Sequence, residues 1–256
     1  MSEIAVLTDL NGTLDRAERI RQELWRTACF EVLGFQGEAD IFKASLGLAG
    51  KDVIPAVGAA MREAGYSNVT DEDVGRVYKR RNIILENEGY EAKGYPFREG
   101  AVELLRELHG FGFPIAIVTS ETEAHAMRSA ERNGIKDLIA GVVGRDTKVD
   151  GNELKRKPDS MPYDVAARRI EEHREAKIRF VAMEDTAPGM FAALTSRPVE
   201  DLVHSRDIQG SWDIAKQMER ISGGMFSQDE LLKNIALQDA DFGQIAEFFR
   251  EMRKVL

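Results

Sequence analysis

Residues 3–13 read EIAVLTDLNGT, and the interpretation of the whole chain starts from this stretch. Its apolar residues form a run of strand length, which ends in the polar pair Thr8-Asp9. Short apolar runs of this kind are typical of strands buried in a parallel sheet. The following Asn11-Gly12 pair is also typical of a hairpin turn, so this stretch taken alone predicts a turn rather than a functional site.

Further apolar runs follow, separated from one another by helical segments. Strands are predicted at residues 114–119, 138–143 and 178–183, and helices at residues 99–109, 121–133, 161–174 and 188–195. Strands that alternate with helices indicate a parallel sheet with helices on both faces. The predicted fold class is therefore α/β, with a Rossmann-like parallel sheet as its core.

One block interrupts this alternation directly after the first strand. Residues 15–94 have helical periodicity, and Thr70-Asp71-Glu72-Asp73 within the block is typical of a capped helix start. We therefore expect a core built from residues 1–14 and 95–256, with an inserted all-helical cap domain at residues 15–94. The segment from residue 205 onward has a polar, helical pattern that predicts no role.

Composition narrows the function classes. The 256 residues carry a net charge of −9, which disfavours a nucleic-acid-binding surface. Cys29 is the single cysteine, so no intrachain disulfide can form. Neither a secretory leader nor an apolar run long enough to span a membrane is recognisable. These features predict a soluble, cytoplasmic protein without a membrane partner.

Polar residues collect where the predicted strands end. Asp9 follows the first strand, Thr119-Ser120 the second, and Glu184-Asp185 the fourth, while Lys157 lies in a loop before a helix. In an open α/β sheet, ligands bind beyond the carboxyl ends of the strands. Carboxylates there suit Mg²⁺, a lysine suits a phosphoryl group, and Gly12-Thr13 allows backbone amides to approach a phosphate. This set predicts phosphoryl transfer, with Lys155 as the alternative to Lys157.

Thr119-Ser120 and Glu184-Asp185 also have simpler interpretations. Either pair can cap the helix that follows it. We expect Thr119-Ser120 to cap its helix as well as bind phosphate, whereas two adjacent carboxylates at a strand end favour a metal site.

Four segments in order resemble the motifs of the haloacid dehalogenase superfamily. They are residues 9–14 (DLNGTL), 115–120 (IAIVTS), 157–163 (KPDSMPY) and 183–189 (MEDTAPG). The inserted helical block resembles the cap of the subfamily that contains β-phosphoglucomutase and many small phosphatases. The resemblance implies a Mg²⁺-dependent phosphatase, with the cap closing over a small phosphorylated metabolite such as a sugar, polyol or nucleotide phosphate.

The resemblance also implies a role for each matching residue. Asp9 is then the nucleophile and a metal ligand, and the main-chain carbonyl of Asn11 is a second ligand. Asp185 binds the metal with support from Glu184. The remaining assignments are phosphate binding by Gly12, Thr13, Thr119, Ser120 and Lys157, and substrate specificity for the cap residue Lys51.

One position departs from the family pattern. Phosphatases and mutases of the family usually have an aspartate two residues after the nucleophile, where it acts as general acid and base, and here that residue is Asn11. An amide cannot do this work, which contributes about 10²–10⁴-fold to rate. Three accounts are open: an introduced mutation, a natural enzyme with a slow or long-lived phosphoenzyme, and an enzyme in which another acid substitutes.

Several other functions compete with a phosphatase. A phosphomutase of the same fold is handicapped equally by Asn11. A phosphonoacetaldehyde-type hydrolase would use Lys51 as a Schiff base, and a dehalogenase would have no use for the Glu184-Asp185 pair. A non-catalytic protein that binds a phosphorylated metabolite is the alternative outside enzymes. For each of them we expect a monomer or homodimer.

Overall fold

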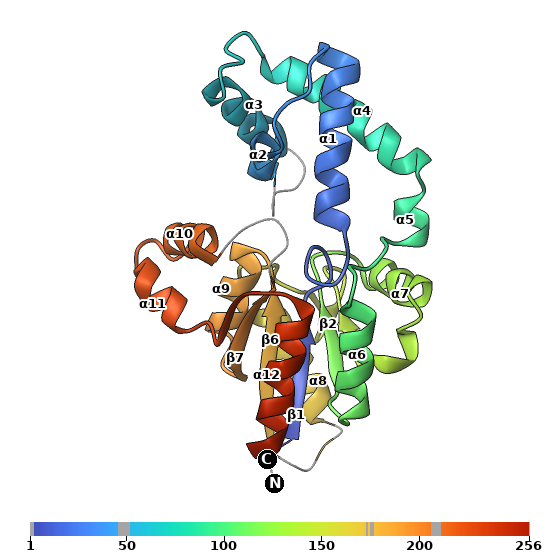
Figure 1. Cartoon of the computed structure of the whole chain (residues 1–256), viewed down its shortest axis with the longest axis vertical. Coiled ribbons are helices and arrows are strands. Elements are labelled where there is room, and N and C mark those ends of the chain that lie inside the picture. The colour runs from blue at the N-terminus through green and yellow to red at the C-terminus, as the bar shows by residue number, and fades with distance from the viewer. Residues whose placement is uncertain (1–2, 46–51, 173, 175–176, 206–210, 256) are drawn as a thin grey trace. The chain divides into compact units, whose positions relative to one another are not determined.

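The computed structural model describes residues 3–45, 52–172, 174, 177–205 and 211–255 (Figure 1). The chain divides into two compact units, a core formed by Met1–Arg16 with Gly94–Leu256 and a helical unit formed by Ala17–Lys93. Each unit is described by itself. Among the described residues, no helix is long and apolar enough to cross a membrane.

The core contains a six-stranded sheet in the order β3-β2-β1-β6-β7-β8, and every neighbouring pair is parallel (Figure 1). The strands are β1 (Glu3–Thr8), β2 (Ile115–Val118), β3 (Gly141–Val143), β6 (Ile178–Glu184), β7 (Val199–Ser205) and β8 (Leu237–Ala240). A separate antiparallel pair is formed by β4 (Lys148–Val149) and β5 (Asn152–Glu153). The prediction of an α/β fold with a parallel sheet is confirmed.

Strand β1 shows why this sheet is covered on both faces. Its side chains alternate between two hydrophobic clusters, with Ala5 and Leu7 in one and Ile4 and Val6 in the other. Successive side chains of a strand point to opposite faces, so a continuous apolar run can be buried only between two layers.

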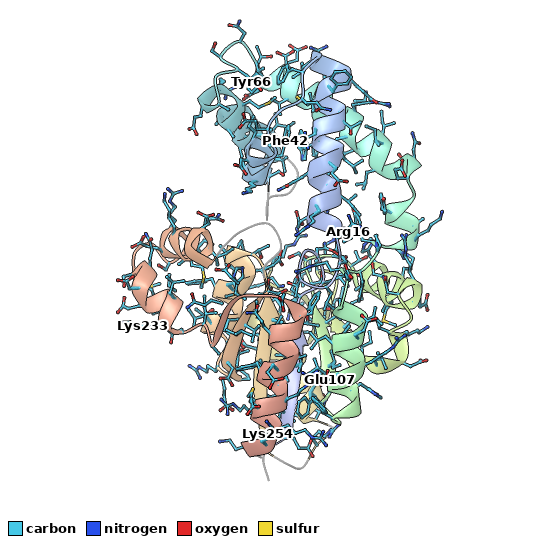
Figure 2. The ribbon with its side chains drawn as sticks, in the orientation of Figure 1. Arg16, Phe42, Tyr66, Glu107, Lys233 and Lys254 are labelled. Carbon is cyan, nitrogen blue, oxygen red and sulfur yellow. The ribbon has the colours of Figure 1, made fainter. Side chains whose placement is uncertain are left out.

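Helices from distant parts of the chain supply the two layers. One cluster contains side chains of α6 (Ala101–Gly110), α7 (Glu123–Arg132) and α12 (Phe242–Val255). The other contains side chains of α8 (Met161–Glu171), α9 (Ala187–Thr195), α10 (Ser211–Ile221) and α11 (Gln228–Lys233). Glu107 of α6, labelled in Figure 2, forms an ion pair with Arg250 of α12 at 2.6 Å, which joins helices far apart in sequence.

The helical unit has its own hydrophobic core. It comprises α1 (Ala17–Leu33), α2 (Ala39–Phe42), a 3-10 turn at Lys43–Ser45, α3 (Val53–Glu63), α4 (Asp71–Asn87) and α5 (Tyr90–Lys93). Trp25 of α1 stacks on Phe42, labelled in Figure 2, with ring centroids 5.6 Å apart, and Cys29 is buried in the same cluster. Thr70 begins α4 with a capping box, as its sequence predicts.

Two predictions of secondary structure are wrong. Residues 138–143 were expected as one strand, but Lys136–Leu138 is a 3-10 turn and β3 covers only Gly141–Val143. The segment from residue 205 onward was expected to be helical, yet it also supplies β8, and β7, directly before it, was not predicted. Both strands contain acidic residues, and β8 lies at the sheet edge, so neither shows the apolar run that marks a buried strand.

Candidate active site

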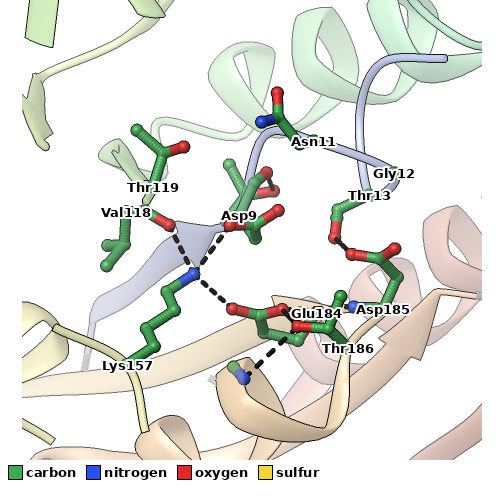
Figure 3. Close-up of polar contacts among 12 residues, drawn as sticks. Asp9, Asn11, Gly12, Thr13, Val118, Thr119, Lys157, Glu184, Asp185 and Thr186 are labelled. Atoms are coloured by element: carbon green, nitrogen blue, oxygen red, sulfur yellow. Dashed lines mark hydrogen bonds and ion pairs between the residues drawn. The ribbon is translucent and has the colours of Figure 1, made fainter. Parts of the chain in front are cut away.

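The carboxyl edge of the sheet brings together residues from three strands. Asp9 follows β1, Thr119 follows β2, and Asp185 follows β6 (Figure 3). The backbone N–H of Asp9 donates to the carbonyl of Met183 at 2.9 Å, and that of Thr119 donates to Val143 at 2.9 Å. The hydrogen bonding of the sheet therefore extends to Asp9 and Thr119 and fixes the backbone from which their side chains project.

Lys157 is the central cation of the site. Its Nζ atom donates to Asp9 Oδ1 at 2.7 Å, to Glu184 Oε1 at 2.5 Å and to the carbonyl of Val118 at 2.8 Å (Figure 3). Burial by itself would lower the pKa of Lys157, but the Asp9 and Glu184 carboxylates outweigh it and hold that pKa above its ordinary value. Lys157 is thus a permanent cation in contact with Asp9.

Lys155, the alternative to Lys157, lies elsewhere. Its side chain is 68% exposed and pairs with Asp159 at 3.5 Å on the surface. Of the two lysines considered from the sequence, Lys157 is the one that the structure brings to Asp9.

Glu184 orients the lysine. Its Oε1 accepts from Lys157 and, at 2.6 Å, from the hydroxyl of Tyr163, and its Oε2 accepts from the Asp185 N–H at 3.3 Å and the Thr186 hydroxyl at 3.5 Å. Burial and the neighbouring Glu184 charge raise the pKa of Tyr163 well above its ordinary value, so the phenol keeps its proton and donates it. This network holds the Glu184 carboxylate in one orientation.

The loop after β1 is tied to the rest of the site by hydrogen bonds. Gly12 has φ 85°, a conformation that favours glycine, and its N–H donates to Asp15 Oδ1 at 3.2 Å. The Thr13 hydroxyl donates to Asp185 Oδ1 at 2.8 Å, which links the loop to β6. The sequence predicts phosphate binding by Gly12 and Thr13. In the structure the Thr13 side chain contacts Asp185 of the Glu184-Asp185 pair.

Arg98 is a residue of this region that sequence analysis missed. Its guanidinium donates to the carbonyls of Gly12 at 2.8 Å and Thr13 at 2.9 Å and to the Ser205 hydroxyl at 3.0 Å. It also lies over the Phe242 ring, 4.7 Å from the centroid. Ser205 ends β7 and Phe242 begins α12, so Arg98 connects the C-terminal segment to the loop that follows Asp9.

Three carboxylates at this edge could hold a metal ion. Asp9, Glu184 and Asp185 are all buried, and each offers an oxygen within 4.8 Å of the others. Hard oxygen donors of this kind fit Mg²⁺, which takes one or two carboxylates together with water and phosphate oxygens. Because Glu184 is already held by four donors, Asp9 and Asp185 are the better placed of the three.

The remaining candidates lie around this centre. Thr119 is buried and its hydroxyl accepts from the Glu121 N–H at 3.1 Å, whereas Ser120 is exposed. The expectation that Thr119-Ser120 caps the next helix is wrong, because the N-cap of α7 is Thr122. The side chain of Asn11 donates from Nδ2 to Glu121 Oε1 at 3.0 Å. Lys51 lies outside the described residues.

Two further residues contact Glu184, and the sequence predicted no role for either of them. Tyr163 closes the quoted KPDSMPY segment, and its hydroxyl reaches Glu184 across 21 positions in sequence. Gly189 closes the MEDTAPG segment, and a Cβ atom there would overlap the Glu184 carboxylate. Only their places at the ends of these segments marked them in the sequence.

The parallel sheet with an acidic centre at its carboxyl edge defines the chain as an α/β protein with a candidate metal site. The profile of the haloacid dehalogenase-like hydrolases matches residues 5–195. The chain belongs to this family, and the resemblance seen in the four sequence segments is confirmed. A search of curated proteins returned no match.

Solved structures share the fold at low sequence identity. A haloacid dehalogenase family hydrolase from Deinococcus radiodurans R1, solved with bound phosphate and sodium, is 20% identical, with a TM-score of 0.66 over 94% of this chain and 92% of that one. A predicted phosphoglycolate phosphatase from Haemophilus somnus is 17% identical, with a TM-score of 0.57 over 79% and 85%. A candidate β-phosphoglucomutase from Thermotoga maritima is 19% identical, with a TM-score of 0.55 over 90% and 97%.

Proposed function

We propose that this hydrolase is a Mg²⁺-dependent phosphatase that cleaves a small phosphorylated metabolite through an aspartyl-phosphate on Asp9. The observation that carries the proposal is the contact of Asp9 with the buried cation of Lys157, 2.7 Å away at the edge of the sheet. Family membership and the phosphate bound by the Deinococcus radiodurans relative support phosphate-ester chemistry.

The residues of the site divide the work. Asp9 attacks phosphorus, and Lys157 offsets the negative charge that would otherwise repel the attacking carboxylate. Thr119, with the backbone at Ser120 and Gly12-Thr13, is proposed to hold the phosphoryl oxygens. Glu184 acts as a positioning residue, because it orients Lys157 and is itself held by Tyr163.

Asp9 and Asp185 are the residues proposed to hold Mg²⁺, with Glu184 beside them. The ion would neutralise further phosphoryl charge when bound. Thr13 donates to Asp185 and so limits the orientations open to that carboxylate.

Asn11 supports a second candidate, a protein that binds a phosphorylated metabolite without turning it over. The amide cannot donate a proton to the leaving oxygen, although all groups proposed to bind phosphate and metal are present. The two functions differ in a single measurable property, the release of phosphate.

The test is a panel of sugar, polyol and nucleotide phosphates with Mg²⁺, scored by inorganic phosphate. The chain is compared with Asp9→Asn, with Asn11→Asp and with the control Asp137→Asn, which changes an exposed aspartate outside the site. We expect Mg²⁺-dependent release that Asp9→Asn abolishes and Asp137→Asn leaves unchanged. Release that survives in Asp9→Asn contradicts the proposed nucleophile. Phosphate binding without release in either the chain or Asn11→Asp favours the binding protein.

A further inference from the structure

The side chain of Asn11 has one hydrogen-bonding partner that bears directly on catalysis. Its Nδ2 atom donates to Oε1 of Glu121 at 3.0 Å, across 110 positions in sequence. With Glu121 ionised, the amide presents its N–H to the carboxylate, because the opposite orientation would place two acceptors against each other. Asn11 Oδ1 is buried and has no hydrogen-bond partner among the described residues. A hydroxyl or water at the site can therefore satisfy this oxygen.

The backbone around Glu121 is fixed against the site. Its N–H donates to the Thr119 hydroxyl at 3.1 Å, and its carbonyl accepts from Arg145 at 2.8 Å. Gly144 lies so close that a Cβ atom there would be 2.8 Å from the Glu121 carbonyl oxygen and 2.5 Å from the Glu123 nitrogen. Glu121 thus lies in the same loop as Thr119, and its side chain contacts Asn11, two residues after Asp9.

The other carboxylate of this loop is engaged elsewhere. Glu123 accepts from the Thr147 hydroxyl, and its Oε1 lies 3.5 Å from Arg169. Glu121 is the one of the two that contacts Asn11.

We infer that Glu121 is the general acid and base of the reaction and that Asn11 is the residue that positions it. This inference rests on the proposed function. The carboxyl that the family pattern places two residues after the nucleophile would then be supplied by Glu121, which the amide of Asn11 contacts. An amide N–H can donate to one carboxyl oxygen whether or not the other oxygen carries a proton. An aspartate at position 11 would instead place two carboxylates in contact.

The two steps of the reaction balance with these groups. In the first, an Asp9 oxygen bonds to phosphorus, the ester P–O bond breaks, and the Glu121 proton moves to the leaving oxygen to give an alcohol. In the second, Glu121 takes a proton from water, whose oxygen bonds to phosphorus while the bond from phosphorus to Asp9 breaks. Inorganic phosphate leaves, and both carboxyl groups return to their starting states.

Leaving-group dependence separates this role from a structural one. An alkyl phosphate needs a proton on its leaving oxygen, whereas a nitrophenyl phosphate does not. With Mg²⁺, we expect Glu121→Gln to lower alkyl phosphate turnover by about 10²–10⁴-fold. The same variant should release about one equivalent of nitrophenolate from the aryl ester in a rapid burst and then stall as the phosphoenzyme, visible by intact mass. Glu131→Gln on α7, which removes a surface carboxylate paired with Lys136, is the control and should behave like the unaltered chain.

The exchange variant Asn11→Asp/Glu121→Gln completes the test. This variant places a carboxyl at position 11 and an amide at position 121. We therefore expect it to turn over alkyl phosphates faster than Glu121→Gln does. Unfolded variants are recognised by their melting temperature, and Glu121→Asp, which keeps the carboxyl, should retain more activity than Glu121→Gln.

The outcomes distinguish this inference from the proposed function. If Glu121→Gln turns over alkyl phosphates as fast as the unaltered chain, Glu121 has no such role while the Asp9 reaction stands. Glu121 also has no such role if the exchange variant folds and stays inactive, or if Asn11→Asp releases phosphate and the unaltered chain does not. If neither the chain nor Asn11→Asp releases phosphate from any ester, the proposed function itself fails.

Discussion

A Cβ atom on Gly189 would lie 2.1 Å from the carboxyl carbon of Glu184. The first turn of α9 therefore packs directly against the group that holds Lys157. Gly189→Ala must displace Glu184, and we expect about 10²-fold lower turnover with a loss of about 1–3 kcal/mol in unfolding free energy. The control is Gly110→Ala at the end of α6, where a Cβ atom would meet no described residue within 4 Å. Equal activity of the two variants would show that the position of Glu184 is unimportant.

Lys157 compensates two buried carboxylates. Lys157→Met leaves Asp9 and Glu184 without their cation, and breaking a buried pair in this way costs about 3–5 kcal/mol. We expect loss of phosphatase activity and a lower unfolding free energy in urea. Lys155→Met removes an exposed surface pair and should change stability by less than about 1 kcal/mol. A Lys157→Met protein as stable as Lys155→Met would contradict the charge compensation seen here.

Magnesium should stabilise the folded chain through Asp185. A ligand at about 100 times its Kd adds about 2.7 kcal/mol to the unfolding free energy. We expect Mg²⁺ to raise the Tm of the chain, EDTA to reverse the rise, and Asp185→Asn to remove most of it. Asp137→Asn is the control. It changes an exposed aspartate in the turn at Lys136–Leu138, outside the acidic cluster, and the variant should respond to Mg²⁺ as the unaltered chain does. A full response in Asp185→Asn would place the ion elsewhere.

Arg98 connects the loop after Asp9 to the C-terminal segment. Arg98→Met keeps much of the aliphatic stem but removes the donors to Gly12, Thr13 and Ser205. We expect a loss of about 1.5–3 kcal/mol or more in stability together with reduced turnover, since the loop carbonyls lose a charged donor. Arg106→Met, on the exposed side of α6, is the control and should lower neither stability nor turnover. Calorimetry and phosphate release measure both effects.

The helical unit should respond to acid through Asp73. The backbone N–H of Thr70, together with Arg76 and the Thr70 hydroxyl, lowers the pKa of Asp73 from 3.8 to about 2. A carboxyl whose pKa is depressed on folding stabilises above its unfolded pKa, so its contribution should vanish as the pH falls from 3.8 to about 2. Amide exchange of α4 should show this loss, and Asp73→Asn should abolish it. Thr70→Ala should weaken α4 by about 1 kcal/mol at neutral pH.

Much of the core could be predicted because its signals are local. The apolar runs that become β1, β2 and β6, and the helical repeat between them, are visible within windows of a few residues. Strands β7 and β8 could not be predicted this way, because half-polar strands are stabilised by their neighbours in the sheet rather than by their own pattern.

The sequence by itself determined which candidate catalytic residues the chain carries. Asp9, Lys157 and Asp185 stand at strand ends or in a loop before a helix, and parallel strands must bring their carboxyl ends to one edge. The four segments around these residues also identify the family.

Only the tertiary structure decided how these groups are held and what accompanies them. Tyr163, Gly189, Arg98 and Glu121 act through contacts with residues distant in the chain, and no local pattern encodes a contact between segments that meet only after folding. The opening segment EIAVLTDLNGT thus specified a strand and its carboxylate. The loops before α7 and α8, which carry Glu121 and Lys157, determined which partners Asn11 and Asp9 meet.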